Sequence, residues 1–197
     1  MTSSSYPPGP ADRLPPLPLE LLDAEQRAAA EELIAGPRKA VLGPFIALLR
    51  SPELLARVQR VGEYLLFRSA LSPRVTEFAT LIVARYWTQQ FEWCAHVPKA
   101  LAAGTQRETI ASLRAGMRPD GMDEDETYVH DFASELLHNR GVSDMTYRRA
   151  CGRFGERGVV DLTGLIGYFA LVNMVLNVAH TPPEVAEGVE QLQRWPL

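Results

Sequence analysis

An acid, a thiol and a histidine occur together in one stretch of the chain. Glu77 stands nineteen residues before His96, and Cys94 stands two residues before it. On one unbroken helix, a separation of nineteen residues would place two side chains about 28 Å apart. Glu77 and His96 can therefore act together only if the chain turns back between them, and we expect that turn at residues 88–90.

These residue types are suited to proton transfer. An imidazole titrates near neutral pH, and a neighbouring carboxylate fixes its tautomer and raises its basicity. Glu92 is a second candidate partner, because it precedes His96 by four residues and falls on the same face of a helix. The residues do not decide between Glu77 and Glu92. The structural alternative is a packing histidine, with Glu77 neutralised by Arg74 or Arg85.

Cys94 is a candidate for redox chemistry. A peroxidatic role requires a thiolate and normally a resolving cysteine nearby. Side chains two positions apart on a helix point about 200° apart, and the other cysteine, Cys151, is distant in the sequence. We expect Cys94 to be buried and inert.

Arginines and aromatic residues surround this stretch. A planar guanidinium can hold a carboxylate through two hydrogen bonds, and Arg38, Arg68, Arg74 and Arg85 all lie in or beside expected helices. Arg74 and Arg85 are the two that we predict to bind substrate. Tyr86 and Trp93 can form an apolar wall of the same site, although aromatic residues also fill any core.

The pattern resembles the carboxymuconolactone decarboxylase family, which includes the alkyl hydroperoxidase D proteins. The hydroperoxidase branch carries two redox cysteines six and three residues before the histidine, where this chain has Gln90 and Trp93. The chain is therefore similar to the branch that keeps the acid and the histidine but lacks the Cys-x-x-Cys pair. The matching positions are Arg74, Glu77, Glu92, Trp93, His96 and 100–104, and those shared with longer members are Arg38, 43–45, 51–53 and 158–177.

The resemblance implies an all-α, alkyl-hydroperoxidase-D-like domain of about eight helices that forms dimers, trimers or hexamers. It implies a cofactor-free lyase that decarboxylates a small carboxylated lactone or related cyclic acid. His96 would be the acid or base, Glu77 its orienting partner, and Glu92 part of the substrate site. Two alternatives remain open: a thiol peroxidase that uses Cys94, and a noncatalytic oligomer that binds a small ligand.

Composition limits the partners. A chain of 197 residues suits a single domain, and a net charge of -4 without a basic stripe argues against nucleic acid. The first residues show no basic and apolar signal pattern, and two distant cysteines suit a reducing compartment. We expect a cytoplasmic protein whose partners are a small carboxylic acid or lactone and copies of itself.

Local signals divide the chain into helices. Six prolines in residues 1–18 predict an extended arm, followed by one helical domain over residues 19–197. No stretch alternates as a strand would. Helix starts are predicted at Asp23 with Gln26, Ser51-Pro52, Ser72-Pro73, Thr105 with Glu108, Asp123 and Ser143, the last helix reaching Gly155 or Gly158 before a long apolar helix.

The apolar stretch at residues 159–179 and one histidine pair complete the candidates. The stretch contains Asp161, Asn173 and Asn177, which are costly in a bilayer, so we expect a core or subunit-interface helix and no membrane span. Glu135 and His138 are three residues apart, but a di-metal bundle needs two such motifs. We therefore expect no metal and no cofactor.

Overall fold

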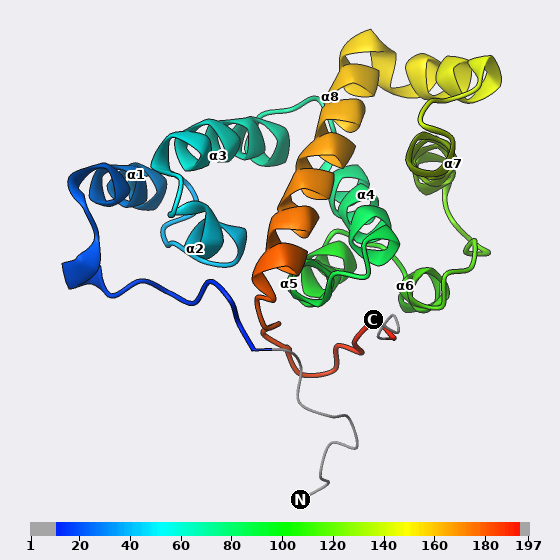
Figure 1. Cartoon of the computed structure of the whole chain (residues 1–197). Coiled ribbons are helices and arrows are strands. Elements are labelled where there is room, and N and C mark those ends of the chain that lie inside the picture. The colour runs from blue at the N-terminus through cyan, green and yellow to red at the C-terminus, as the bar shows by residue number, and fades with distance from the viewer. Residues whose placement is uncertain (1–10, 194–197) are drawn as a thin grey trace, which may run out of the picture.

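The computed structural model describes residues 11–193, and these residues form eight α-helices and one short 3₁₀ helix, with no strand among them (Figure 1). The prediction of an all-α fold is confirmed. The elements are η1 (Leu19–Leu21), α1 (Ala24–Ala35), α2 (Pro44–Leu48), α3 (Pro52–Phe67), α4 (Pro73–Tyr86), α5 (Gln90–Ala102), α6 (Arg107–Arg114), α7 (Glu124–Asn139) and α8 (Asp144–Ala179).

Most of the helix starts follow the predicted capping residues. Asp23 accepts the backbone N–H of Gln26 at 2.8 Å, and the Gln26 side chain accepts the N–H of Asp23 in return. Asp123 begins α7 through the same reciprocal pair with Glu126. Ser72 caps α4 through the N–H of Val75. Such bonds satisfy N–H groups that have no partner within the helix, so the helix starts can be read from the sequence.

The predicted capping box at Thr105 is wrong. Helix α6 begins at Arg107 with Gln106 as its N-cap residue, and the Thr105 hydroxyl is buried without a hydrogen-bond partner. The reason lies in the preceding helix, because the N–H of Thr105 donates to the carbonyl of Ala100 in the last turn of α5. That bond holds Thr105 against the last turn of α5, and the Thr105 side chain lies in the interior.

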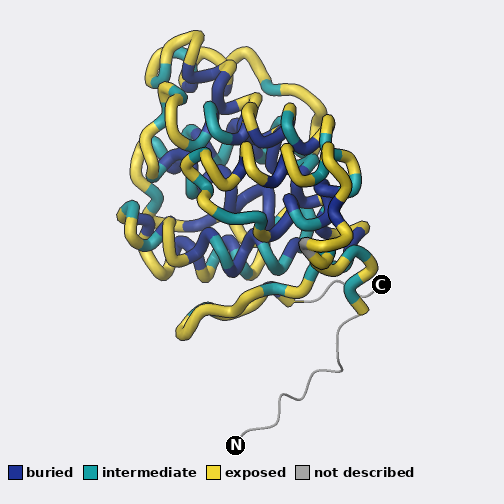
Figure 2. The backbone as a smooth tube through the Cα atoms, turned by 90° about the vertical axis from the view of Figure 1, so that its left-hand side faces the viewer, coloured by how far each residue is buried: buried dark blue, intermediate teal, exposed yellow. Residues whose placement is uncertain are grey.

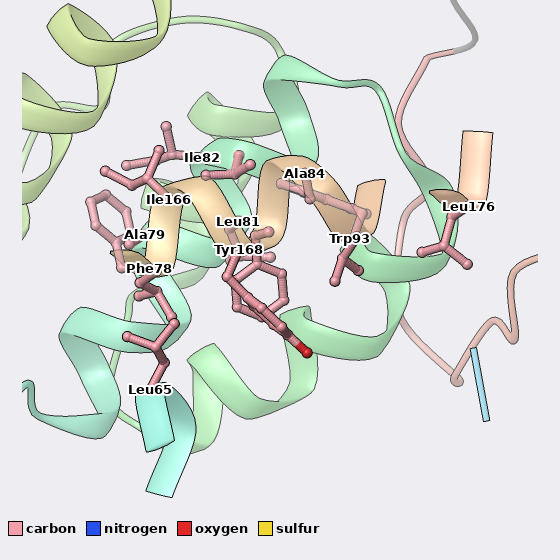
Figure 3. Close-up of a cluster of buried hydrophobic side chains, with 14 of the residues drawn as sticks. Leu65, Phe78, Ala79, Leu81, Ile82, Ala84, Trp93, Ile166, Tyr168 and Leu176 are labelled. Atoms are coloured by element: carbon pink, nitrogen blue, oxygen red, sulfur yellow. The ribbon is translucent and has the colours of Figure 1, made fainter. Parts of the chain in front are cut away.

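Helix α4 lies at the centre of the fold and packs against α5, α6, α7 and α8. Its middle is almost fully enclosed, with Phe78, Leu81 and Val83 each 0% exposed. Figure 3 shows side chains of α4 gathered with Trp93 of α5 and with residues of α8. Buried backbone fills the interior, and exposed segments lie on the outside (Figure 2). Residues placed on α4 are therefore held rigidly by four neighbouring helices.

Helix α8 changes direction at Gly155. The backbone there has φ 71° and ψ 171°, so the first part of α8 leaves the long second part at a sharp angle (Figure 1). This break agrees with one of the two glycines predicted to end the preceding helix. The second part passes through the core, and its Asp161 accepts hydrogen bonds from the Tyr64 hydroxyl and the Ala70 N–H.

By length and composition alone, α8 could cross a membrane, but 56% of its most apolar stretch is buried inside the protein. A core helix passes the same test, and in this fold α8 contacts α2, α3, α4 and α7. Its Asp161 is hydrogen-bonded inside the protein, to the Tyr64 hydroxyl and the Ala70 N–H. Helix α8 is thus a core helix of this fold.

Both ends of the described chain run along the helices. Of the predicted arm, residues 1–10 lie outside the described residues, whereas residues 11–18 lie near α8 and α2. Arg13 donates its backbone N–H to Ala179, and Arg50 donates to the carbonyls of Leu14 and Pro15. At the other end, Leu192 exchanges two hydrogen bonds with the side chain of Gln90.

We expect Gly155→Ala to lower the free energy of unfolding by about 1–3 kcal/mol, because only glycine adopts its backbone conformation without strain. Thermal unfolding measures the change. Gly152→Ala is the matched control, since Gly152 is helical, exposed and has no atom near its added Cβ. The control should stabilise the protein by up to about 1 kcal/mol, and equal shifts in the two variants would contradict the prediction.

Candidate active site

A tight reversal between α4 and α5 brings the two halves of the site together. Thr88 has a left-handed backbone with φ 49°, and Gln89 caps α5 by accepting the N–H groups of Phe91 and Glu92. Helix α8 holds the reversal in place, because Asn177 accepts a hydrogen bond from Gln89 and donates one to the carbonyl of Trp87. The chain turns at residues 88–90, where the sequence predicts it.

His96 is held between two carboxylates. Its Nδ1 lies 2.5 Å from Oε2 of Glu77, and its Nε2 lies 3.2 Å from Oε2 of Glu92. The sequence left open which glutamate is the partner, and in the structure both are, one at each ring nitrogen. His96 and Glu92 are buried at 5% and 4% exposure, whereas the Glu77 side chain is 14% exposed. Of the triad formed by Glu77, Glu92 and His96, Glu77 therefore has the most access to solvent.

The charges of the triad favour a protonated imidazole. Burial by itself lowers the pKa of His96, but the hydrogen bonds to Glu77 and Glu92 and their negative charges outweigh it and hold the pKa above its ordinary value. The imidazolium can then donate one N–H to each glutamate. Phe169 of α8 packs its ring edge-to-face against the imidazole, with the centroids 5.2 Å apart. The three side chains can therefore hold one exchangeable proton on His96, away from bulk solvent.

Tyr168 and Arg38 lie next to the triad. Arg38 donates to the Tyr168 hydroxyl at 3.1 Å, and its guanidinium stacks 4.6 Å from the centre of the Phe45 ring. Burial raises the pKa of Tyr168 to about 12, while Arg38 acts to lower it and Glu92 to raise it. The hydroxyl therefore lies within electrostatic reach of both groups, and it points out of the apolar cluster in Figure 3.

Gly62 makes room for this contact. A Cβ added at Gly62 would lie 2.3 Å from the Tyr168 hydroxyl oxygen and 2.7 Å from Nη2 of Arg38. Nε of Arg38 is buried and has no hydrogen-bond partner. Arg38 is one of four arginines near the predicted site, but the two predicted to bind substrate are Arg74 and Arg85, and no sequence pattern points to Gly62. The only available signal was the position of Arg38 among the residues shared with longer family members.

The other residues predicted for the site make contacts of their own. Arg74 pairs with Asp123 at 2.7 Å and with Glu126 at 3.1 Å, so it joins α4 to the start of α7. Trp93 is 0% exposed, and its indole N–H donates to the carbonyl of Glu190. Both contacts are structural, although Arg74 stands one helical turn before Glu77 on α4 and Trp93 one turn before His96 on α5.

Arg85 and Tyr86 are at the far end of α4. They follow Glu77 by eight and nine residues, which corresponds to about 12 Å along a helix. Arg85 donates to the carbonyl of Arg114, and the Tyr86 hydroxyl donates to the carbonyl of Leu137. These two residues line a groove of about 400 Å³ between α4, α6 and α7, apart from the triad.

Cys94 is enclosed and held as a thiol. It is 1% exposed, and burial raises its pKa to about 11, so the reactive thiolate is disfavoured at neutral pH. Cys151 lies on α8, and neither cysteine is in a disulfide. This environment agrees with the expectation of a buried, inert thiol.

Glu135 and His138, the one pair considered as metal ligands, make other contacts. Glu135 accepts hydrogen bonds from Ser143 and Thr146, and Nδ1 of His138 contacts the carbonyl of Ser134. Within residues 11–193 no group of three or more His, Cys, Asp and Glu side chains is arranged to hold a metal ion. In the triad, the two carboxylates approach opposite ring nitrogens and so do not share a centre with the imidazole.

Comparison with known families supports the resemblance. The model of the Carboxymuconolactone decarboxylase family matches residues 52–135, which extend from the start of α3 into the last part of α7. This match confirms the predicted family for the segment that carries Glu77, Glu92 and His96. A search of curated proteins finds no match to the chain.

We expect His96→Ala to lower the free energy of unfolding by about 3–5 kcal/mol near neutral pH, because it leaves Glu77 and Glu92 buried without their cation. The part of the loss that comes from the raised pKa of His96 should be larger at about pH 5 than at about pH 7, because that stability is fully present only at the lower pH. Urea unfolding at both pH values measures the loss.

His138→Ala is the control, because His138 is exposed and contacts a backbone carbonyl. Its effect should be well below that of His96→Ala. In the wild type, the raised pKa of His96 contributes stability that is fully present below about pH 6.5 and is lost as the pH rises through the folded pKa. Equal stability of the two variants at both pH values would refute the buried triad.

Proposed function

We propose that the protein is a cofactor-free lyase similar to carboxymuconolactone decarboxylase, acting on a small carboxylated lactone or related cyclic acid. Support comes chiefly from one observation: a buried imidazole with a raised pKa lies between two carboxylates, within the segment that matches the family. An imidazolium in an enclosed site is a proton donor whose pKa is set by its neighbours.

The proposed reaction begins with loss of carbon dioxide. The bond between the carboxyl carbon and the ring breaks, and its electron pair moves into the conjugated lactone carbonyl to form a dienolate. A proton is then delivered to carbon, and His96 becomes a neutral imidazole that regains a proton from solvent. Glu77 holds Nδ1 throughout and fixes the orientation of the ring.

Glu92 is the proposed path of this proton. It contacts Nε2 of His96 on one side, and its charge acts on the Tyr168 hydroxyl on the other. A proton passed from Nε2 to Glu92 would therefore move toward the side of Arg38 and Tyr168. This role explains why the Glu92 carboxylate lies beside Nε2 of His96, the ring nitrogen that would otherwise face a substrate.

Arg38 is the proposed anchor for the substrate. Its guanidinium has an unpartnered buried Nε, and no Asp or Glu oxygen among the described residues lies within 4.0 Å of it. An arginine supported by an aromatic ring can hold a carboxylate in a fixed plane. Because an ion pair stabilises a carboxylate against loss, Arg38 would hold a carboxyl or carbonyl group that remains in the product.

A noncatalytic ligand-binding protein is the second candidate. It is favoured by the near-complete burial of His96 and by the protein carboxylates at both of its ring nitrogens. The thiol peroxidase alternative has less support, because burial of Cys94 raises its pKa to about 11.

We expect purified wild type, under reducing conditions without added metal, to release carbon dioxide from 4-carboxymuconolactone with loss of its ultraviolet absorbance. His96→Gln should reduce turnover by about 10²–10⁴-fold, the usual contribution of a positioned acid. Arg38→Gln should raise KM more than it lowers kcat. Arg57→Gln is the control, since Arg57 forms an exposed pair with Glu53. No turnover by folded wild type would reject this substrate and favour the noncatalytic candidate.

We also expect the alkaline limb of kcat to report the proton on His96. Activity should fall as the pH rises through the pKa of His96, which lies above its ordinary value. Glu77→Gln removes a negative charge that raises this pKa, so the limb should move to lower pH. A pH profile of kcat for both proteins measures the shift, and an unchanged limb would argue against His96 as the acid.

A further inference from the structure

The groove between α4, α6 and α7 has no part in the proposed decarboxylation. Its volume of about 400 Å³ is in the range of small-molecule sites. Helix α4 contributes Ile82, Arg85 and Tyr86, and α7 contributes His130 and His138. The segment after α6 supplies the remaining rim. The groove thus combines apolar and cationic side chains in one concave surface.

Arg85 supplies an available positive charge. Its Nε donates to the carbonyl of Arg114, and within residues 11–193 no Asp or Glu oxygen lies within 4.0 Å of its guanidinium. Gly116 has φ +74°, and a Cβ there would lie 2.7 Å from Nη2 of Arg85. The guanidinium is therefore fixed at one edge against the backbone while its remaining donors are not used by a carboxylate of the described chain.

His130 supplies an unused hydrogen-bonding atom. Its Nδ1 is buried without a hydrogen-bond partner, and the nearest carboxylate oxygen, Oδ1 of Asp131, is 3.6 Å away. Asp131 instead accepts from Arg118 at 2.8 Å. Burial lowers the pKa of His130, and the charge of Arg118 lowers it further. A neutral imidazole at this place can form one hydrogen bond with a polar group of a ligand without adding a second full charge.

Aromatic and apolar side chains provide the wall. Tyr86 packs edge-to-face against His138, with centroids 5.1 Å apart and planes at 90°, and Ile82 and Leu113 also line the groove. Rings held in this way present a flat surface for another ring. A buried unpartnered nitrogen, an available guanidinium and an aromatic wall therefore meet in one groove.

We infer that this groove binds a small aromatic or cyclic monocarboxylate. Its carboxylate pairs with Arg85, its ring lies against Tyr86 and His138, and a hydroxyl or carbonyl on the ring contacts His130. The site is separate from the triad. It gives Arg85 and Tyr86 the type of ligand that the sequence predicts for them, at a different place from His96.

The test uses 4-hydroxybenzoate, benzoate and the neutral benzyl alcohol as probes of the full-length protein, by calorimetric titration. We expect saturable binding of both acids, binding of benzyl alcohol at least about tenfold weaker, and a loss of at least about tenfold for the acids in Arg85→Gln, since a charged hydrogen bond is removed. His130→Ala should weaken 4-hydroxybenzoate more than benzoate.

Two further variants keep the test decisive. Ser134→Phe fills the groove without changing a charge and should abolish binding, whereas Arg148→Gln, an exposed arginine on α8, should leave it unchanged. Thermal unfolding checks that each variant is folded. Equal binding by wild type and Arg85→Gln, equal binding of benzoate and benzyl alcohol, or loss of binding only in Arg38→Gln would each overturn the inference, the last by placing the anion near the triad.

Discussion

The structure depends on an imidazole buried between two carboxylates. Removing three ionisable groups from water is costly, and the cost is offset only if the donors and acceptors meet with good geometry. Glu77 comes from α4 and Glu92 and His96 from α5, so the two helices must be fixed relative to each other. The left-handed residue at Thr88, the cap at Gln89 and its bond to Asn177 of α8 provide that fixation.

Local features of the fold could be predicted from the sequence, because capping is decided within one helical turn. Asp23, Ser72 and Asp123 begin helices where their side chains meet N–H groups three residues on. Thr105 has the same local pattern but fails, since the preceding helix captures its N–H first. A capping motif thus predicts a helix start only when the backbone N–H of the capping residue is not already bonded to the preceding helix.

The members of the site were less predictable, because long side chains take their positions from tertiary packing. The spacing of residues along the chain predicted the reversal, and it gave both partners of His96 as alternatives. It could not predict that Arg74 would pair with α7 or that Arg85 would donate to α6. Arg38 is remote in sequence and reaches Tyr168 only because Gly62 has no side chain. The relevant contact joins three separate segments, and no local pattern encodes it.

Two histidines show how carboxylate geometry sets charge. Burial lowers the pKa of both imidazoles. His96 has two glutamate oxygens within 3.2 Å, and its pKa is raised overall. His130 has Arg118 nearby and its aspartate oxygen 3.6 Å away, and its pKa is lowered. With both glutamates ionised and His96 protonated, the triad carries one net negative charge and repels an approaching carboxylate. Any acidic ligand near it therefore needs a separate cation, which is the physical reason to place the substrate at Arg38.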